Sequence, residues 1–146
     1  DIARPRVGEV HGENGYGLHI EKTFDDMNPD DYALLILPGG APDGAPSTVR
    51  NSAKARSIAK AFMDANKPVA AICHGPYTLI SAGLVKGRKA TSFWGDGVPE
   101  DLRKAGAHYE DSVVVVDGNL VTSRYPMDLP DFMRETMKML KRTHAK

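Results

Sequence analysis

Apolar runs alternate with amphipathic segments along the chain, and this alternation predicts buried strands separated by helices. The runs at 32–37 and 68–72 show no polar alternation, so we expect strands that are buried on both faces. Between them, residues 53–65 place Ala, Ile, Phe and Met side chains on one face, which predicts an amphipathic helix. The pattern therefore predicts an α/β sandwich with a mainly parallel sheet.

Shorter elements are predicted in the remaining segments. We expect strands at 18–24 and 89–93, and a helix at 99–105 with acidic residues in its first turn. Asp117-Gly118-Asn119 lies between two β-rich runs and predicts a hairpin. A final helix should follow, and the residues expected on its inner face are Leu129, Phe132, Met133, Thr136, Met137 and Leu140.

Composition and charge limit the number of domains, the kinds of partner and the compartment that we expect for this chain. No repeat or linker divides the 146 residues, so we expect residues 1–146 to form a single domain. Nineteen basic and nineteen acidic residues give a formal net charge of zero, which offers no electrostatic reason to expect a nucleic-acid or membrane partner. The single cysteine excludes an internal disulfide and fits a reducing compartment, so we expect a cytoplasmic protein.

That cysteine, Cys73, lies where the second buried strand turns into a helix that begins at Pro76 and ends at Gly83. This arrangement is typical of a nucleophile elbow, and Ala71 and Gly75 supply the small residues that it needs on either side. The neighbouring helix N-terminus favours the thiolate form. A lone cysteine is usually a small buried hydrophobe, but this spacing and context favour a reactive thiol.

Other candidate groups follow the same edge of the sheet, because ligands bind at the carboxyl ends of parallel strands. Gly39-Gly40 and Cys73 both follow buried strands and should face each other. His74 is then a candidate proton carrier, and the backbone N–H groups of Gly40 and His74 are candidate oxyanion donors. Asp43 is a possible orienting acid for His74, within one chain or across a subunit contact, although a plain turn explains it more simply. The histidines lack metal-ligand spacing, so we expect no metal.

Five motifs occur together in the chain, at 37–40, 70–76, 79–89, 115–124 and 126–130. In combination they resemble the PfpI family of intracellular cysteine peptidases and protein deglycases, within the class I glutamine amidotransferase-like superfamily. The resemblance implies a flavodoxin-like three-layer sandwich with a mainly parallel sheet. It implies a nucleophile at Cys73, a following His74, and oxyanion donors from Gly40 and His74. It also implies homo-oligomers, either hexamers or dimers.

The chain departs from this family in three places. Family members begin with a strand and a helix that carry an acidic residue next to the elbow cysteine, and this chain starts at Asp1, past that region. We therefore expect a truncated sequence that lacks its first strand and helix. The peptidase branch has a glutamate after Pro-Gly-Gly, where Asp43 is the nearest match. Residues 123–126 stand where amidotransferases carry a catalytic histidine, so glutamine hydrolysis is not expected.

The sequence thus predicts a cysteine hydrolase whose Cys73 thiolate attacks glycated amines, dicarbonyl adducts or small peptides, while His74 moves the proton. The alternative is a redox-sensing or chaperone-like stress protein in which Cys73 is oxidised without turnover. A flavodoxin-like nucleotide binder is a weaker possibility, because no phosphate-binding glycine motif is present. We expect no cofactor.

Overall fold

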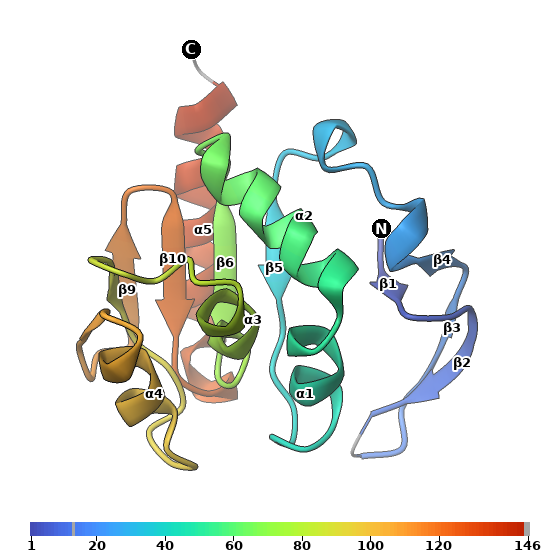
Figure 1. The fold of residues 1–146 in the computed structure, drawn as a ribbon, viewed down its shortest axis with the longest axis horizontal. Coiled ribbons are helices and arrows are strands. Elements are labelled where there is room, and N and C mark those ends of the chain that lie inside the picture. The colour runs from blue at the N-terminus through green and yellow to red at the C-terminus, as the bar shows by residue number, and fades with distance from the viewer. Residues whose placement is uncertain (13, 145–146) are drawn as a thin grey trace.

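The computed structural model describes residues 1–12 and 14–144. Its centre is a sheet in the order β5-β6-β10-β9 (Figure 1), whose strands are Leu35–Leu37, Val69–Ile72, Leu120–Ser123 and Val114–Asp117. β5, β6 and β10 run parallel, and β9 pairs with β10 in the antiparallel direction. The sheet is therefore mixed but mainly parallel, as the hydrophobic pattern predicted.

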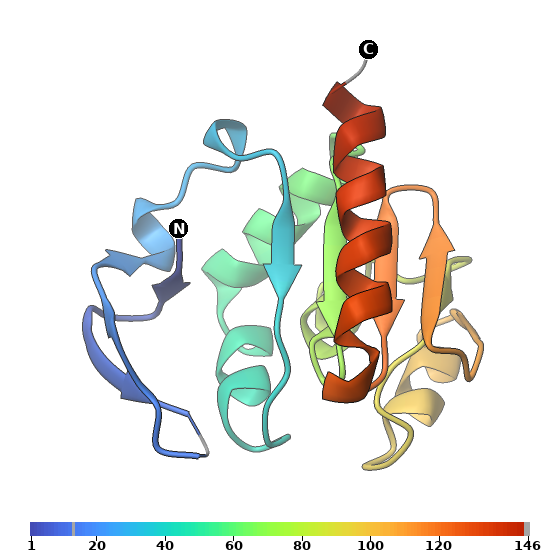
Figure 2. The same cartoon turned by 180° about the vertical axis from the view of Figure 1, so that it is seen from behind.

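Helices cover both faces of this sheet and complete the three layers of a flavodoxin-like sandwich (Figures 1 and 2). α1 (Ala45–Arg50), α2 (Ala53–Asp64) and α3 (Pro76–Ser81) lie on one face, and α5 (Leu129–His144) lies on the other. α4 (Val98–Lys104) packs next to α3. Within the described residues, no helix combines the length and the apolar composition that crossing a bilayer requires.

β6 is buried along its whole length, and its side chains alternate between the two cores. Val69 and Ala71 belong to the larger core, which contains Phe62 of α2. Ala70 and Ile72 belong to the smaller core, which contains Phe132 of α5. The uninterrupted apolar run at 68–72 is explained by this burial on both faces.

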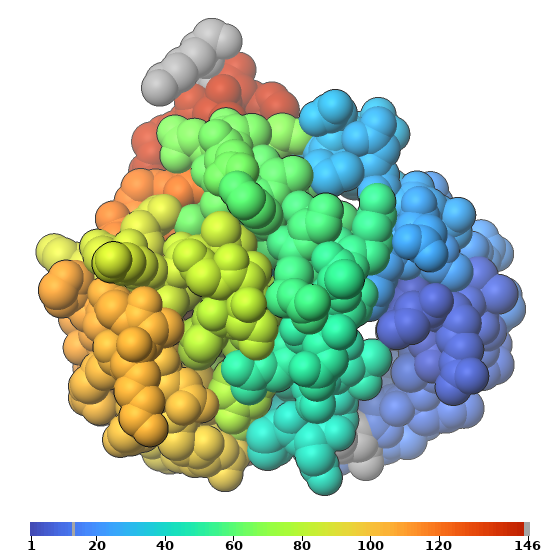
Figure 3. Space-filling view, in the orientation of Figure 1, coloured from blue at the N-terminus to red at the C-terminus, as the bar shows by residue number. Residues whose placement is uncertain are grey.

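Among the described residues, three strand pairs flank the central sheet. β1 (Ala3–Arg4) pairs with β4 (Lys22–Thr23), β2 (Gly8–His11) forms a hairpin with β3 (Gly17–Ile20), and β7 (Lys89–Ala90) pairs with β8 (His108–Tyr109). Short 3-10 turns lie at Phe24–Asp26, Pro29–Asp31 and Pro126–Asp128, and α2 contacts the first two of them. In the space-filling view, the N-terminal part of the chain accordingly lies beside α1 and α2 (Figure 3).

The helices predicted at 53–65, 76–83 and 99–105 are confirmed to within two residues, and so is the hairpin. Three predicted strands are shorter than expected. The run at 32–37 is a strand only from Leu35, the segment 18–24 divides into β3 and β4, and β7 ends at Ala90. Beyond the end of β7, the next backbone N–H is that of Thr91. It donates to the side-chain hydroxyl of Thr122.

The inner face predicted for the last helix was partly wrong. Its buried residues are Phe132, Thr136 and Met139, whereas Leu129, Met133 and Met137 are exposed. The three buried positions are spaced by four and three residues and so share one face, which packs on β6, β9 and β10. Thr136 is tolerated on this face because its hydroxyl donates to the Phe132 carbonyl at 2.7 Å.

Candidate active site

Cys73 occupies the sharp turn expected between β6 and α3. Its φ is 64°, in the left-handed region that strains residues with a side chain. Backbone hydrogen bonds hold it on two sides: its N–H donates to the Ser123 carbonyl at 3.1 Å, and its carbonyl accepts from the Phe93 N–H at 3.0 Å. The strained turn is therefore fixed by the end of β10 and by the segment after β7.

Two glycines allow the end of β5 to approach this turn. A Cβ at Gly75 would lie 2.2 Å from the Leu37 carbonyl oxygen, and a Cβ at Gly39 would lie 2.8 Å from the Cβ of Cys73. Gly40 has a φ of 142°, which residues with side chains rarely adopt. Gly39 thus lies against Cys73, as their positions after parallel strands predicted, and Gly40 follows it in the chain.

The side chain of His74 joins the thiol to a carboxylate. Its Nδ1 lies 3.2 Å from Cys73 Sγ, and its Nε2 lies 2.9 Å from Asp96 Oδ2. An ionised carboxylate can only accept a hydrogen bond, so Nε2 carries the proton in this contact and Nδ1 is left to accept the thiol proton. The arrangement is that of a nucleophile, a base and an orienting acid.

Two aromatic rings fix the position of the His74 imidazole. The Phe93 ring lies 4.9 Å and the Tyr77 ring 5.5 Å from it, measured between ring centroids. His74 is 4% exposed, so its ring is held almost entirely by protein contacts. Burial raises the pKa of Tyr77 above its usual value and keeps its hydroxyl neutral, and the Arg50 guanidinium lies 4.2 Å from its ring centroid.

Asp96 is the residue that the sequence analysis missed. It lies 22 positions after His74 in the loop between β7 and α4, with a φ of 56°. Asp43, which was considered instead, is exposed in the turn before α1. Asp tolerates the left-handed region better than most residues, so the Gly95-Asp96-Gly97 sequence was the available signal. A role for Asp43 across a subunit contact stays a prediction.

Arg124 directly follows β10. It donates to Asp128 at 2.9 Å and to Asp111 at 3.0 Å. The hydrogen bond from Arg124 lowers the pKa of the buried Asp128 carboxyl, and both acids raise the pKa of the guanidinium. Arg124 therefore holds the loop after β10, close to the backbone that supports Cys73.

The oxyanion role of the Gly40 and His74 amides stays a prediction. A metal centre has no candidate ligands in the part of the chain that the structure describes, since no three His, Cys, Asp or Glu side chains converge there.

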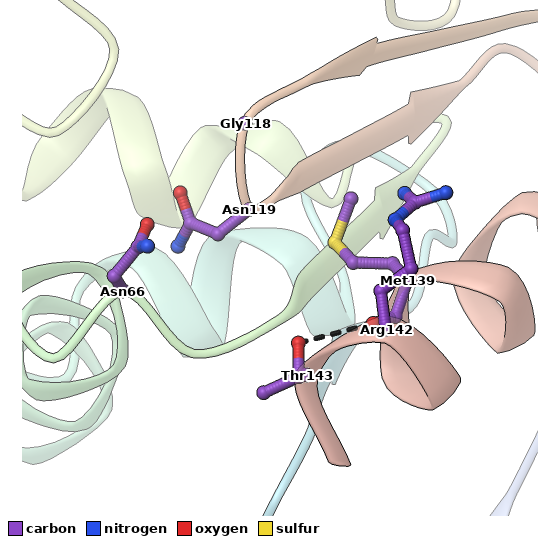
Figure 4. Close-up of a pocket in the computed structure, with 6 residues that line it drawn as sticks. All are labelled: Asn66, Gly118, Asn119, Met139, Arg142 and Thr143. Carbon is purple, nitrogen blue, oxygen red and sulfur yellow. Dashed lines mark hydrogen bonds between the residues drawn. The ribbon is translucent and has the colours of Figure 1, made fainter. Parts of the chain in front are cut away.

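A hollow of about 250 Å³ lies at the other end of β6. Figure 4 shows it between the β9–β10 turn and the end of α5, and its lining consists of Asn66, Gly118, Asn119, Met139, Arg142 and Thr143. Two of its polar side chains are engaged within the protein: Asn119 donates to the Lys67 carbonyl, and Thr143 donates to the Met139 carbonyl. It contains no nucleophile or base, so it is not where the predicted chemistry would occur.

The fold and the site place this protein in the class of flavodoxin-like sandwiches that carry a cysteine on a strained turn between a strand and a helix. Comparison with known proteins identifies the family. The DJ-1/PfpI family matches residues 1–139, and the chain belongs to this family. The deglycase PH1704 of Pyrococcus horikoshii is 48% identical over 140 residues, which cover 96% of this chain and 81% of that protein. The putative cysteine protease YraA of Bacillus subtilis is 42% identical over 133 residues, which cover 91% and 76%.

The solved structures agree with this assignment. A two-domain protein of Anabaena variabilis, with a DJ-1/ThiJ/PfpI-like and a ferritin-like domain, is 34% identical to this chain with a TM-score of 0.84. The match covers 96% of this chain and 38% of that larger one. The resemblance drawn from the sequence motifs is therefore confirmed, and so is the fold.

Proposed function

We propose that this chain is a cysteine-dependent hydrolase that acts on glycated amines, dicarbonyl adducts or small peptides. The observation that carries the proposal is the series from Cys73 Sγ through His74 to Asp96, with contacts of 3.2 and 2.9 Å. The names of the relatives, deglycase and putative cysteine protease, support hydrolysis as the class of reaction.

For an amide substrate the steps follow from this geometry. The thiol proton moves to His74 Nδ1, and the thiolate adds to the carbonyl carbon as the C–O double bond opens to an oxyanion. The backbone N–H groups of Gly40 and His74 are the proposed donors to that oxyanion. The imidazolium then gives its proton to the leaving nitrogen, the C–N bond breaks, and a thioester remains on Cys73.

Water completes the cycle with the same residues. His74 Nδ1 takes a proton from water, and the resulting hydroxide adds to the thioester carbon. Breaking of the C–S bond releases the acid and returns the proton to sulfur. Asp96 acts throughout as a positioning residue, because its carboxylate keeps the proton on Nε2 and stabilises the imidazolium. A dicarbonyl adduct shares the first step, the addition of sulfur to a carbonyl carbon.

Replacing the nucleophile tests the proposal. Cys73→Ala should abolish turnover of both peptides and methylglyoxal-modified amines, because the chain contains no other thiol. Turnover is measured by release of the free amine, with the unaltered chain as reference and circular dichroism to verify folding. Undiminished release by Cys73→Ala from both kinds of substrate would end the proposal.

Three expectations from the sequence remain predictions beside this proposal: assembly into hexamers or dimers, a cytoplasmic location, and the absence of a cofactor. The redox-sensing or chaperone-like alternative is not favoured, because the relatives are named as a deglycase and a putative cysteine protease.

A further inference from the structure

An exposed group of aromatic side chains borders the site. Trp94 is 49% and Tyr125 43% exposed, and their ring centroids lie 5.4 Å apart. Phe93 supports both, with its ring 4.9 Å from Trp94 and 5.8 Å from Tyr125. Large aromatic surface left in water is costly, so such a group commonly marks a binding surface. We call Phe93, Trp94 and Tyr125 the aromatic patch.

The aromatic patch is continuous with the reactive residues. The Phe93 ring contacts the His74 ring at 4.9 Å, and the Phe93 backbone N–H donates to the Cys73 carbonyl. Its members come from two segments, the loop after β7 and the residues after β10. The Phe93 hydrogen bond and the ion pairs of Arg124 hold these segments in place. The surface is therefore formed before a substrate arrives, which lowers the entropic cost of binding.

The separation between the aromatic patch and His74 favours an extended substrate. Phe93 links His74 to Trp94 by two ring contacts of 4.9 Å each, so these two rings lie at most about 10 Å apart, the length of about three extended residues at ~3.3 Å each. An extended peptide held at Cys73 is long enough to reach the aromatic patch. Exposed ring faces contact apolar and aromatic side chains favourably.

We infer that the aromatic patch binds an aromatic or large apolar side chain of a peptide-linked substrate, two to three residues from the group that Cys73 attacks. The inference rests on the proposed function and specifies its substrate class. It assigns Trp94 and Tyr125 a role in substrate specificity.

Trp94 is the only tryptophan of the chain, so its fluorescence reports directly on the aromatic patch. The Cys73→Ala chain, which cannot complete turnover, is titrated with a short peptide that carries Phe two or three residues from the reacting carbonyl. A matched peptide with Ala at that position is the reference. We expect a saturable change in Trp94 fluorescence and roughly tenfold tighter binding of the Phe peptide, which corresponds to about 1.4 kcal/mol.

Kinetics of the chain with Cys73 intact give a second readout. Trp94→Ala and Tyr125→Ala should each reduce the preference for the Phe peptide over the Ala peptide, chiefly through KM, and the double substitution should bring it close to one. Tyr16→Ala is the matched control, because Tyr16 is 75% exposed and lies in the turn between β2 and β3. Trp94→Phe should restore most of the preference.

Equal binding of the two peptides, or a preference that survives the double substitution, would overturn the inference. A change of oligomeric state in the double variant, measured by light scattering, would overturn it too, because the patch would then be a contact between copies. A Phe preference in the fluorescence titration with no turnover by the Cys73-containing chain would support the aromatic patch while refuting the proposed hydrolase.

Discussion

The two ends of β6 both carry a residue in the left-handed region, but only one end carries the candidate active site. Asn66, before the strand, has a φ of 55° and borders the hollow of Figure 4. Cys73, after the strand, has a φ of 64° and borders His74 and the end of β5. Backbone conformation and a nearby hollow are therefore not sufficient signs of a site.

Asn66 and Cys73 differ in the strain that the left-handed conformation causes and in the groups that surround them. Asn enters the left-handed region readily, and Asn66 does so just after α2, with its N–H bonded to the Met63 carbonyl as in many helix ends. Cys gains no such local stabilisation, so its strain persists because Ser123 and Phe93 hold its backbone. Strain held by surrounding structure, beside a base and a carboxylate, is what distinguishes the candidate active site.

Among the substitutions that test this comparison, the one at Asp96 is expected to have the largest effect on activity. Asp96→Asn should lower kcat/KM by roughly 10²–10³-fold, because an amide can donate to Nε2 and so favours the wrong imidazole tautomer. Stability should change little, since the Asp96 side chain is 46% exposed. Steady-state kinetics measure the first effect, and urea unfolding measures the second.

Two control variants accompany Asp96→Asn. Asp43→Asn alters the other candidate acid at the same end of the sheet, and Arg142→Gln alters the hollow at the opposite end. We expect both to keep most of the activity. A large loss in Asp43→Asn combined with a normal Asp96→Asn would show that the orienting acid has been assigned wrongly.

Substitutions of glycine test the packing at the two ends of β6. Gly75→Ala should lower the free energy of unfolding by about 3 kcal/mol, because the new Cβ would meet the Leu37 carbonyl oxygen and backbone must move. Gly118→Ala, next to the hollow, should cost only about 1 kcal/mol, since its φ of 57° is the main obstacle. Chemical denaturation of both variants gives the comparison, and equal costs would contradict it.

A smaller effect, dependent on pH, is expected at Asp128. The hydrogen bond from Arg124 lowers the pKa of this carboxyl in the folded protein. Such a group stabilises the fold fully above its unfolded pKa of about 3.9, and this contribution disappears as the pH falls through the folded value. Asp128→Asn should therefore cost about 2 kcal/mol near neutral pH and progressively less below about pH 4.

Denaturant unfolding of Asp128→Asn and the unaltered chain at several pH values makes this measurement. A difference in stability that stays constant from neutral to strongly acidic pH would show that the Arg124 pair does not act through the charge of Asp128.

Much of the fold was predictable because a strand that is buried on both faces has an uninterrupted apolar sequence. The run at 68–72, the amphipathic segment at 53–65 and the Asp117-Gly118 turn each have one simple structural solution. Elements that depend on tertiary partners were harder. β7 is short where the Thr122 side chain bonds the next N–H, and the rotation of α5 is decided by its contacts with β6, β9 and β10.

The candidate site likewise contains some residues that local sequence predicts and others that depend on tertiary contacts. Cys73 and His74 are adjacent in the sequence, and the small residues around them follow local steric rules, so the elbow could be predicted. Asp96 reaches His74 only through the path of the loop between β7 and α4; the Gly95-Asp96-Gly97 sequence indicates a turn there but not a contact with His74. The aromatic patch likewise forms only when the loop after β7 meets the end of β10.

Stoichiometric alkylation tests the central claim most directly, because Cys73 is the only thiol in the chain. Increasing amounts of iodoacetamide are added, the alkylated fraction is measured by mass spectrometry, and turnover is measured on the same samples. The Cys73–His74–Asp96 mechanism predicts that activity falls in proportion to alkylation and disappears when one group per chain has been added. Full alkylation with turnover retained would contradict it.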